Sequence, residues 1–316
     1  MKLHAFGARG SLPAPSTAGF NTSKYGGNTT CYYLEAGPFQ IIIDMGSGAR
    51  PLGDYLLKKG ENGKPFIFLL THYHSDHIQG IGFCVPFYIK QNTFYIHGFT
   101  PEGRENVDPL KNVVLQALEE QQASPYFPVP HGLLPANKRY RAHNRMFSEE
   151  FYYVEKAGDF LYKTESDIQD SHSFKRDKII KVTTVPLHHP NGCLGYRVDY
   201  MDSSLAFCTD NEPFAFTNNK INNLCKDVDL IVLDGQYTAE QLAGLTQTFG
   251  HGNPELCVDQ AIDCNAKRLL ITHMDPGHDD KKVTEMEKTC IDYYTKKKSD
   301  TLKGVEFVKE GETWEV

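Results

Sequence analysis

The chain has 316 residues, which exceeds the usual size of one domain but suits a large single-domain α/β enzyme. Hydrophobic residues make up 40 % of the chain and charged residues 23 %, a balance that excludes a disordered protein. The 33 basic and 40 acidic residues give a net charge of −7, which provides no general attraction to a nucleic-acid backbone or an anionic bilayer. We therefore expect one globular domain, spanning residues 1–316, that binds neither long nucleic acids nor membranes.

The cysteines and the first residues indicate the cellular compartment. Eight cysteines are scattered without a CxxC pair, which is typical of reduced thiols buried in a large core. The start, MKLHAFGARGSLPAP, lacks the apolar segment of a signal peptide, and no apolar run approaches the ~20 residues of a membrane helix. These features predict a cytoplasmic protein.

Strands and helices are predicted along the whole chain. Apolar runs rich in β-branched and aromatic residues predict strands at 31–35, 40–44, 66–70, 93–96, 179–185, 194–199, 204–208, 230–233, 269–272 and 305–308. Apolar residues at helical spacing predict helices over 107–118, 256–262 and 283–294. Four prolines between Ser124 and His143 predict an irregular excursion there. The mixture predicts an α/β fold.

The densest chemical signal is FIFLLTHYHSDH at residues 66–77, where four potential metal ligands follow an apolar strand. If the chain stays extended beyond Thr71, His72 and His74 point to the same side, while Asp76 and His77 lie on the turn into the next helix. Two imidazoles can then hold one cation, and a carboxylate with an imidazole can hold a second. An ordinary exposed turn explains such a cluster poorly.

This HxHxDH run resembles the signature of the metallo-β-lactamase-fold hydrolases. Further segments agree with that family in order and spacing, namely YGGNTT (25–30), IDMGSG (43–48), LHHP (187–190), GYR (195–197), TD (209–210), GH (250–251) and LITHMDP (270–276). The chain is most similar to the branch with the phosphonate-pathway cyclic phosphodiesterase and the transfer-RNA 3′-processing endonuclease. The resemblance implies an αββα four-layer sandwich, with two mixed β-sheets inside, helices outside and a variable capping insertion at about 84–179.

The resemblance also implies a dinuclear metal site at one edge of the sandwich, with Asp210 bridging two divalent cations. Carried over by position, its ligands are His72, His74, Asp76, His77, His189, Asp210 and His273. Adjacent residues on a strand end face opposite ways, so only one of His188 and His189 can enter the site. The spacing to Gly195 favours His189, and His188 is the alternative.

Two further residues near the strand ends bear on the chemistry. Cys208 lies two residues before Asp210, and a thiolate ligand there would suggest a true β-lactamase, but we interpret Cys208 as a core residue. Asp44 closes an apolar strand, and the resemblance implies that it accepts a hydrogen bond from the metal loop. Two divalent cations and two aspartates sum to a charge of about +2, which suits an anionic substrate.

The resemblance implies a hydrolase that cleaves a small phosphodiester, with cyclic nucleotides as candidates, through attack by a hydroxide that bridges the metals. Asp76 and Asp210 would serve catalysis as well as metal binding, and His251 would protonate the leaving oxygen. Related sequences often carry His-x-Thr where this one has His251-Gly-Asn253. An ordinary loop histidine beside a helix N-cap at Asn253 is therefore the alternative.

Other identities for the metals and the substrate stay open. Zinc is the default, with manganese and iron as alternatives, because these ligands select weakly among such cations. Lactones and thioesters are alternative substrates, since a metal-activated hydroxide also attacks acyl carbon. A diiron oxygen-binding protein is a further alternative, although its relatives usually have glutamate where this chain has His74. A homodimer is a family expectation.

Overall fold

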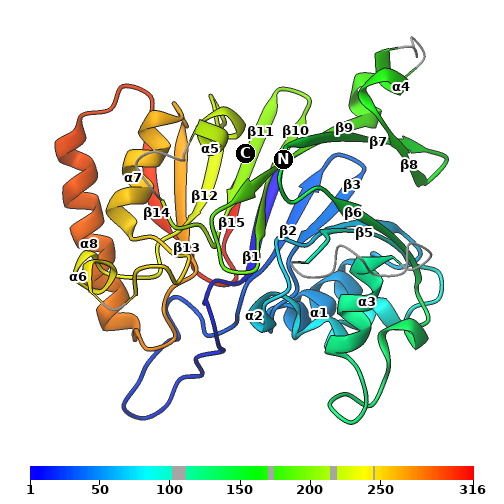
Figure 1. Ribbon diagram of the computed structural model, residues 1–316, viewed down its shortest axis with the longest axis horizontal. Coiled ribbons are helices and arrows are strands. Elements are labelled where there is room, and N and C mark those ends of the chain that lie inside the picture. Colours follow the sequence, from blue (N-terminus) through cyan, green and yellow to red (C-terminus); the bar gives the residue numbers. More distant parts are fainter. Residues whose placement is uncertain (102–111, 170–173, 214–218, 245) are drawn as a thin grey trace.

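The computed structural model describes residues 1–101, 112–169, 174–213, 219–244 and 246–316. Two mixed β-sheets lie face to face, and helices cover their outer faces (Figure 1). The arrangement confirms the predicted α/β four-layer sandwich.

The first sheet contains seven strands in the order β15-β1-β2-β3-β4-β5-β6. Its strands are β1 (Lys2–Gly7), β2 (Cys31–Ala36), β3 (Phe39–Ile43), β4 (Pro65–Leu69), β5 (Thr93–Phe99), β6 (Asn137–His143) and β15 (Thr313–Glu315). Strands β3 to β6 run parallel to one another, so their carboxyl ends lie at one edge of the sheet.

The second sheet contains eight strands in the order β14-β13-β12-β11-β10-β9-β7-β8. Its strands are β7 (Glu149–Lys156), β8 (Asp159–Lys163), β9 (Ile179–Leu187), β10 (Cys193–Tyr200), β11 (Ser203–Cys208), β12 (Leu230–Asp234), β13 (Arg268–Thr272) and β14 (Gly304–Phe307). Strands β11 to β14 are parallel, which gives this sheet a second set of aligned carboxyl ends.

The helices are mostly short and connect the strands. They are α1 (Ala49–Lys59), α2 (Ser75–Ile78), α3 (Val113–Gln121), α4 (Glu165–Gln169), α5 (Asn219–Leu224), α6 (Ala239–Ala243), α7 (Pro254–Asp263) and α8 (Asp280–Lys297). Helices α1 and α3 contact the first sheet, and α5, α7 and α8 contact the second. Among the described residues, no helix has both the length and the apolar character needed to cross a membrane.

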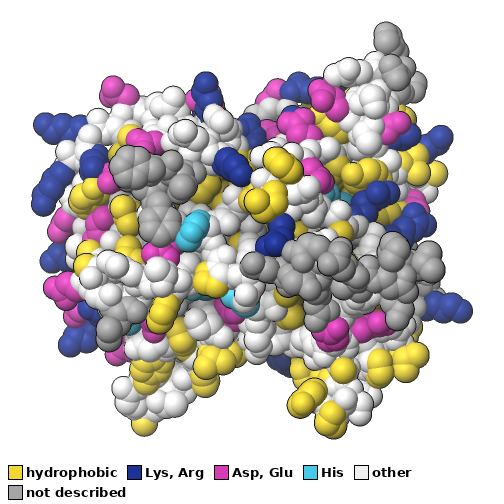
Figure 2. Space-filling model, viewed as in Figure 1, with side chains coloured by type: hydrophobic (Ala, Val, Ile, Leu, Met, Phe, Trp, Pro, Cys, Tyr) yellow, Lys and Arg dark blue, Asp and Glu magenta, His cyan; other side chains and the backbone are white. Residues whose placement is uncertain are grey.

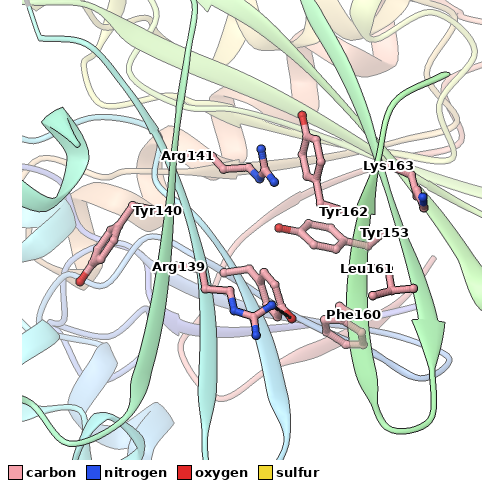
Figure 3. Close-up of a pocket in the computed structure, with 9 residues that line it drawn as sticks. Arg139, Tyr140, Arg141, Tyr153, Phe160, Leu161, Tyr162 and Lys163 are labelled. Carbon is pink, nitrogen blue, oxygen red and sulfur yellow. Dashed lines mark hydrogen bonds between the residues drawn. The ribbon is translucent and has the colours of Figure 1, made fainter. Parts of the chain in front are cut away.

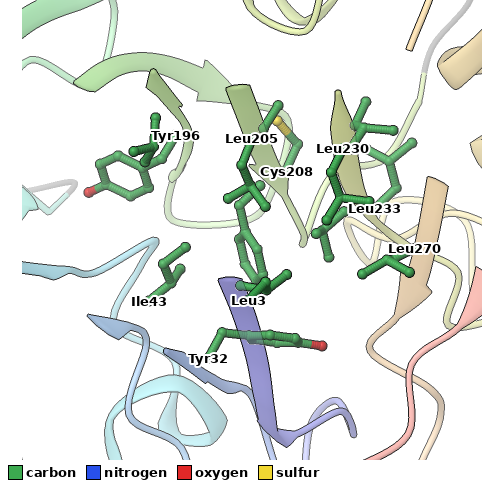
Figure 4. Close-up of a cluster of buried hydrophobic side chains, with 14 of the residues drawn as sticks. Leu3, Tyr32, Ile43, Tyr196, Leu205, Cys208, Leu230, Leu233 and Leu270 are labelled. Carbon is green, nitrogen blue, oxygen red and sulfur yellow. The ribbon is translucent and has the colours of Figure 1, made fainter. Parts of the chain in front are cut away.

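The apolar runs of the central strands are explained by burial on both faces. Ile41 and Ile43 of β3 belong to the core between the sheets, which also contains Tyr196 of the second sheet (Figure 4). Ile42 points the other way and packs with Leu52 of α1 in a second core. All eight cysteines are buried and unpaired, as the sequence predicts.

The stretch with four prolines is more regular than expected. Its last seven residues form β6, which the sequence analysis missed because its alternate residues are charged and exposed, as is common for an edge strand. Residues 84–179 contribute strands to both sheets, and their role as a cap stays a prediction. The helix predicted over 107–118 corresponds to α3, while Val107 and Leu110 lie outside the described residues.

Candidate metal centre

Histidines and carboxylates gather where strands of both sheets end. His72 follows β4 in the first sheet, whereas His189, Asp210 and His273 follow β9, β11 and β13 in the second. Ligands commonly bind outside the carboxyl ends of parallel strands, because loops from several strands converge there. In the space-filling view, histidine side chains are visible near the middle of the face, where the two halves meet (Figure 2).

The first group of potential ligands comprises His72, His74 and His189, whose candidate ligand atoms all lie within 4.8 Å of one another. His189 Nε2 lies 3.0 Å from His74 Nδ1. The other ring nitrogen of His189, Nδ1, lies 3.0 Å from the carbonyl oxygen of Gly250 and donates to it. The lone pair of His189 Nε2 therefore points toward the other histidines, which suits a shared cation.

His72 provides an unpartnered nitrogen at the same point. Its Nδ1 lies 3.1 Å from Thr71 Oγ1, and that hydroxyl donates to Asp44 Oδ2 at 2.7 Å. His72 Nδ1 must then be the donor to the hydroxyl oxygen, which leaves a lone pair on Nε2. This Nε2 is buried and has no hydrogen-bond partner. A buried nitrogen acceptor without a partner is what a ligand of a metal ion requires.

The second group comprises Asp76, His77, Asp210 and His273, all of them buried. His77 Nε2 lies 3.2 Å from His273 Nε2 and 3.3 Å from Asp210 Oδ2. Asp76 Oδ2 lies 3.2 Å from His77 Nε2 and 3.3 Å from His273 Nε2. Two nitrogens and two carboxylates thus converge on one small volume, which is the donor set of a divalent transition metal.

Contacts on the far side of these rings fix their tautomers. His77 Nδ1 donates to Asp44 Oδ2 at 2.7 Å, and His273 Nδ1 donates to Gln236 Oε1 at 2.8 Å. Both Nε2 atoms therefore present lone pairs to the centre when the rings are neutral. The Asp44 contact is the one that the family resemblance implied.

The charges of the second group are strongly coupled. Burial lowers the pKa of His273, but Asp210 and Asp76 outweigh burial and raise that pKa to about 9. Burial raises the pKa of Asp210, but His273 and His77 dominate and hold it well below its ordinary value. The ionised carboxylates therefore attract a positive charge, and a cation at this point would replace the proton that they otherwise draw onto a histidine.

His251 lies beside both ligand groups. Its Nδ1 donates to Asp234 Oδ2 at 2.6 Å and lies 3.8 Å from Asp210 Oδ1. Its ring centroid lies 5.1 Å from those of His189 and His273. Asn253 also caps α7, since its side chain accepts from the backbone N–H of Leu256, so the cap and the histidine at the site coexist.

Three residues of the centre have left-handed backbone conformations. The φ angles are 56° at Asp44, 59° at Asp210 and 62° at His273, each within two residues of the end of a strand of the sandwich. Such conformations are unfavourable for residues other than glycine and are concentrated at functional sites.

The structure brings together all seven ligands that the sequence analysis named, and their role in metal binding stays a prediction. His189 is buried in the first group, whereas His188 is exposed. Cys208 is buried in the core and lies 3.7 Å from the sulfur of Cys225. Sequence reasoning missed Asp234, although it ends the apolar run LIVLD in the way that Asp44 ends its strand. Of the histidines not assigned to the site, His172 lies outside the described residues.

The family model that describes the beta-lactamase superfamily domain matches residues 55–274 of this sequence, a range that contains every proposed metal ligand. The chain belongs to this family. A ribonuclease Z from Prochlorococcus marinus (strain MIT 9515) is 25 % identical over 262 residues, covering 76 % of this chain and 80 % of that protein.

Solved structures agree with the metallo-β-lactamase fold. The protein YhfI from Bacillus subtilis superposes with a TM-score of 0.62 at 18 % identity, covering 100 % of this chain and 98 % of its own. A diphosphatase from the PhnP family gives a TM-score of 0.59 at 15 % identity, covering 100 % of this chain and 97 % of its own. These likenesses show the fold, and the family match is what places the chain among the hydrolases of the beta-lactamase superfamily.

Proposed function

We propose that this metallo-β-lactamase-fold protein is a two-metal hydrolase of a small phosphodiester, with cyclic nucleotides as the first substrates to test. The observation that carries this proposal is the position of Asp210 between the two ligand groups. Its Oδ1 lies 3.9 Å from His72 Nε2 in the first group and 3.2 Å from His273 Nε2 in the second. A carboxylate in this position suits a bridge between two cations.

The donor set fits divalent zinc, with manganese or iron as alternatives. When bound, such a pair lowers the pKa of water and stabilises negative charge on phosphoryl oxygens. The protein contributes the orientation of the rings through Asp44, Gln236 and Gly250. His251 donates its Nδ1–H to Asp234, so Nε2 is the atom that would have to carry a second proton in order to pass one to the leaving oxygen.

The similarity to ribonuclease Z supports a second candidate, which is a phosphodiester within RNA. Both candidates require the same metal centre and differ only in what fits outside it. The net charge of −7 favours the small substrate, because a long RNA would gain little from the overall field of the protein.

The test is hydrolysis of bis(p-nitrophenyl) phosphate, a panel of cyclic nucleotides and a short RNA after reconstitution with zinc or manganese. We expect turnover by the wild type and its collapse in Asp210→Ala. Asp210→Asn is the matched control for folding, because asparagine tolerates a left-handed backbone and keeps the size of the side chain. A metal-loaded wild type that is inert on every phosphodiester would reject this substrate class and direct the search to lactones, thioesters and oxygen.

A further inference from the structure

A second candidate site lies at the open end of the sandwich, between the edge strands β6 and β8. It is a cleft of about 420 Å³, and Figure 3 shows side chains of the two strands facing each other across it. The cleft shares no residue with the ligand groups of the metal centre. Its volume is in the range of small-molecule sites.

Two arginines give the cleft a positive charge. Arg141 places its guanidinium carbon 3.5 Å from the ring centroid of Tyr162, and Arg139 lies 5.1 Å from that of Tyr95. Arg139 Nη1 also donates to the Tyr95 hydroxyl at 3.0 Å. Within the described part of the chain, neither guanidinium forms an ion pair with a carboxylate, so both retain donors for an anionic ligand.

A buried chain of hydrogen bonds sets the direction in which the Tyr153 hydroxyl donates. The carboxylate of Glu149 accepts from His143 Nδ1 at 2.7 Å, so His143 Nε2 must accept from His97 Nδ1, also at 2.7 Å. His97 Nε2 then accepts from the Tyr153 hydroxyl at 2.8 Å.

Burial lowers the pKa of both His97 and His143, which keeps the two rings neutral and the direction of donation fixed. The Tyr153 hydroxyl therefore donates its hydrogen bond to His97. Tyr153 is fully buried beneath the cleft, so this chain of hydrogen bonds fixes the floor of the cleft.

We propose that this cleft binds a nucleotide, with its phosphate on Arg139 and Arg141 and its base against the exposed guanidinium plane of Arg141, which lies over the Tyr162 ring. Guanidinium groups match phosphate oxygens in geometry and charge, and aromatic rings or guanidinium planes are the usual partners of an unpaired base. The nucleotide is either a free mononucleotide or one unit of a single-stranded RNA.

Isothermal titration of the wild-type protein with adenosine 5′-monophosphate tests this site. We expect Arg139→Gln and Arg141→Gln each to weaken binding about 10-fold, since each removes one charge-assisted contact. Arg50→Gln, at an exposed arginine of α1, is the matched control and should bind like the wild type. Unchanged binding in the Arg139→Gln/Arg141→Gln double variant would overturn the proposal.

Further measurements distinguish the role of the Tyr162 ring, the role of charge alone, and whether the nucleotide is free or part of an RNA strand. Tyr162→Leu should weaken binding about 10-fold because it removes the ring that holds the Arg141 guanidinium in place, whereas Tyr162→Phe should not. Inorganic phosphate or pentaglutamate binding as tightly as the nucleotide would overturn the proposal, because charge alone would then explain the site. Binding of a pentaadenylate at least 10-fold tighter than the mononucleotide would support the site and identify an RNA strand as the source. Equal affinity would support it with the free nucleotide as the source.

Discussion

Two clusters of buried histidines in the described part of the chain differ in how many of their ring nitrogens have hydrogen-bond partners. His97 and His143 form a chain in which every ring nitrogen has a partner, ending on Glu149 and Tyr153. In the metal centre, by contrast, His72 Nε2 is buried without a partner. A buried polar atom without a partner is costly.

This difference distinguishes histidines that stabilise the fold from histidines whose nitrogens are available to bind a metal ion. Burial alone does not distinguish them, because His97 and His72 are both within 1 % of complete burial. What distinguishes them is the convergence of lone pairs with carboxylates in one cluster and the closed chain of donors and acceptors in the other. The following predictions test this interpretation, from the largest expected effect to the smallest.

Removal of the carboxylate shared by both ligand groups should have the largest effect. We expect Asp210→Ala to reduce phosphodiester turnover by more than about 100-fold, which exceeds the usual cost of losing an outer partner of a metal ligand. Steady-state hydrolysis together with bound metal per chain is the measurement. Full activity in the variant would mean that the two ligand groups do not act together.

Loss of an outer contact in the same cluster should have a smaller effect. Asp44→Asn keeps the left-handed backbone tolerable but removes the charge that orients His77. We expect metal affinity to fall by about 10- to 100-fold, measured by competition with a chelator. An unchanged affinity would contradict the proposed role of Asp44 in orienting a ligand.

Disruption of the hydrogen-bonded cluster of His97 and His143 should reduce stability and leave metal binding intact. His97→Phe preserves a ring but leaves the Tyr153 hydroxyl and His143 Nε2 without their hydrogen-bond partner. We therefore expect a loss of about 1–3 kcal/mol in the free energy of unfolding. Urea denaturation measures this loss, and metal content serves as the control. A metal-free but stable variant would reverse our assignment of the two clusters.

The smallest expected effect is on how the free energy of unfolding depends on pH. Burial holds the pKa of His97 well below its ordinary 6.5, so the unfolded chain binds a proton that the folded chain excludes. Stability is therefore present above pH 6.5 and falls as the pH drops below it. Between pH 7.5 and 5.5 the wild type should lose about 1.4 kcal/mol more than His97→Phe, measured by urea denaturation. Equal losses would show that His97 becomes protonated within the fold.

The sequence alone predicted the interior of the fold better than its margins. Central strands such as β3 and β12 are apolar on both faces and are recognisable as uninterrupted runs. The edge strands β6 and β8 have one buried residue each and carry charged residues among exposed or partly buried ones, so their pattern is weak without knowledge of their neighbours. The central strands were thus recognisable from sequence, the two mixed sheets followed from the family resemblance, and the strands that form the cleft were not predicted.

The same reasoning applies to the candidate site. Residues 72–77 form a local motif, and the resemblance located the distant partners His189 and His273. Asp234 has no motif of its own, and its contact with His251 arises only because β12 ends beside the loop after α6. The link between His97 and Tyr153 joins strands of opposite sheets, a relation that spacing along the chain does not encode.

The left-handed backbone at Asp44, Asp210 and His273 means that foldability and chemistry make opposite demands on the same positions. Glycine would relieve the local conformational cost, which is greatest for His273 because an imidazole gains least from that geometry. Selection of random variants for protease resistance alone should therefore enrich glycine at these positions, while selection for activity should retain the native residues. Comparing the two outcomes position by position would outline the functional centre without any knowledge of the substrate.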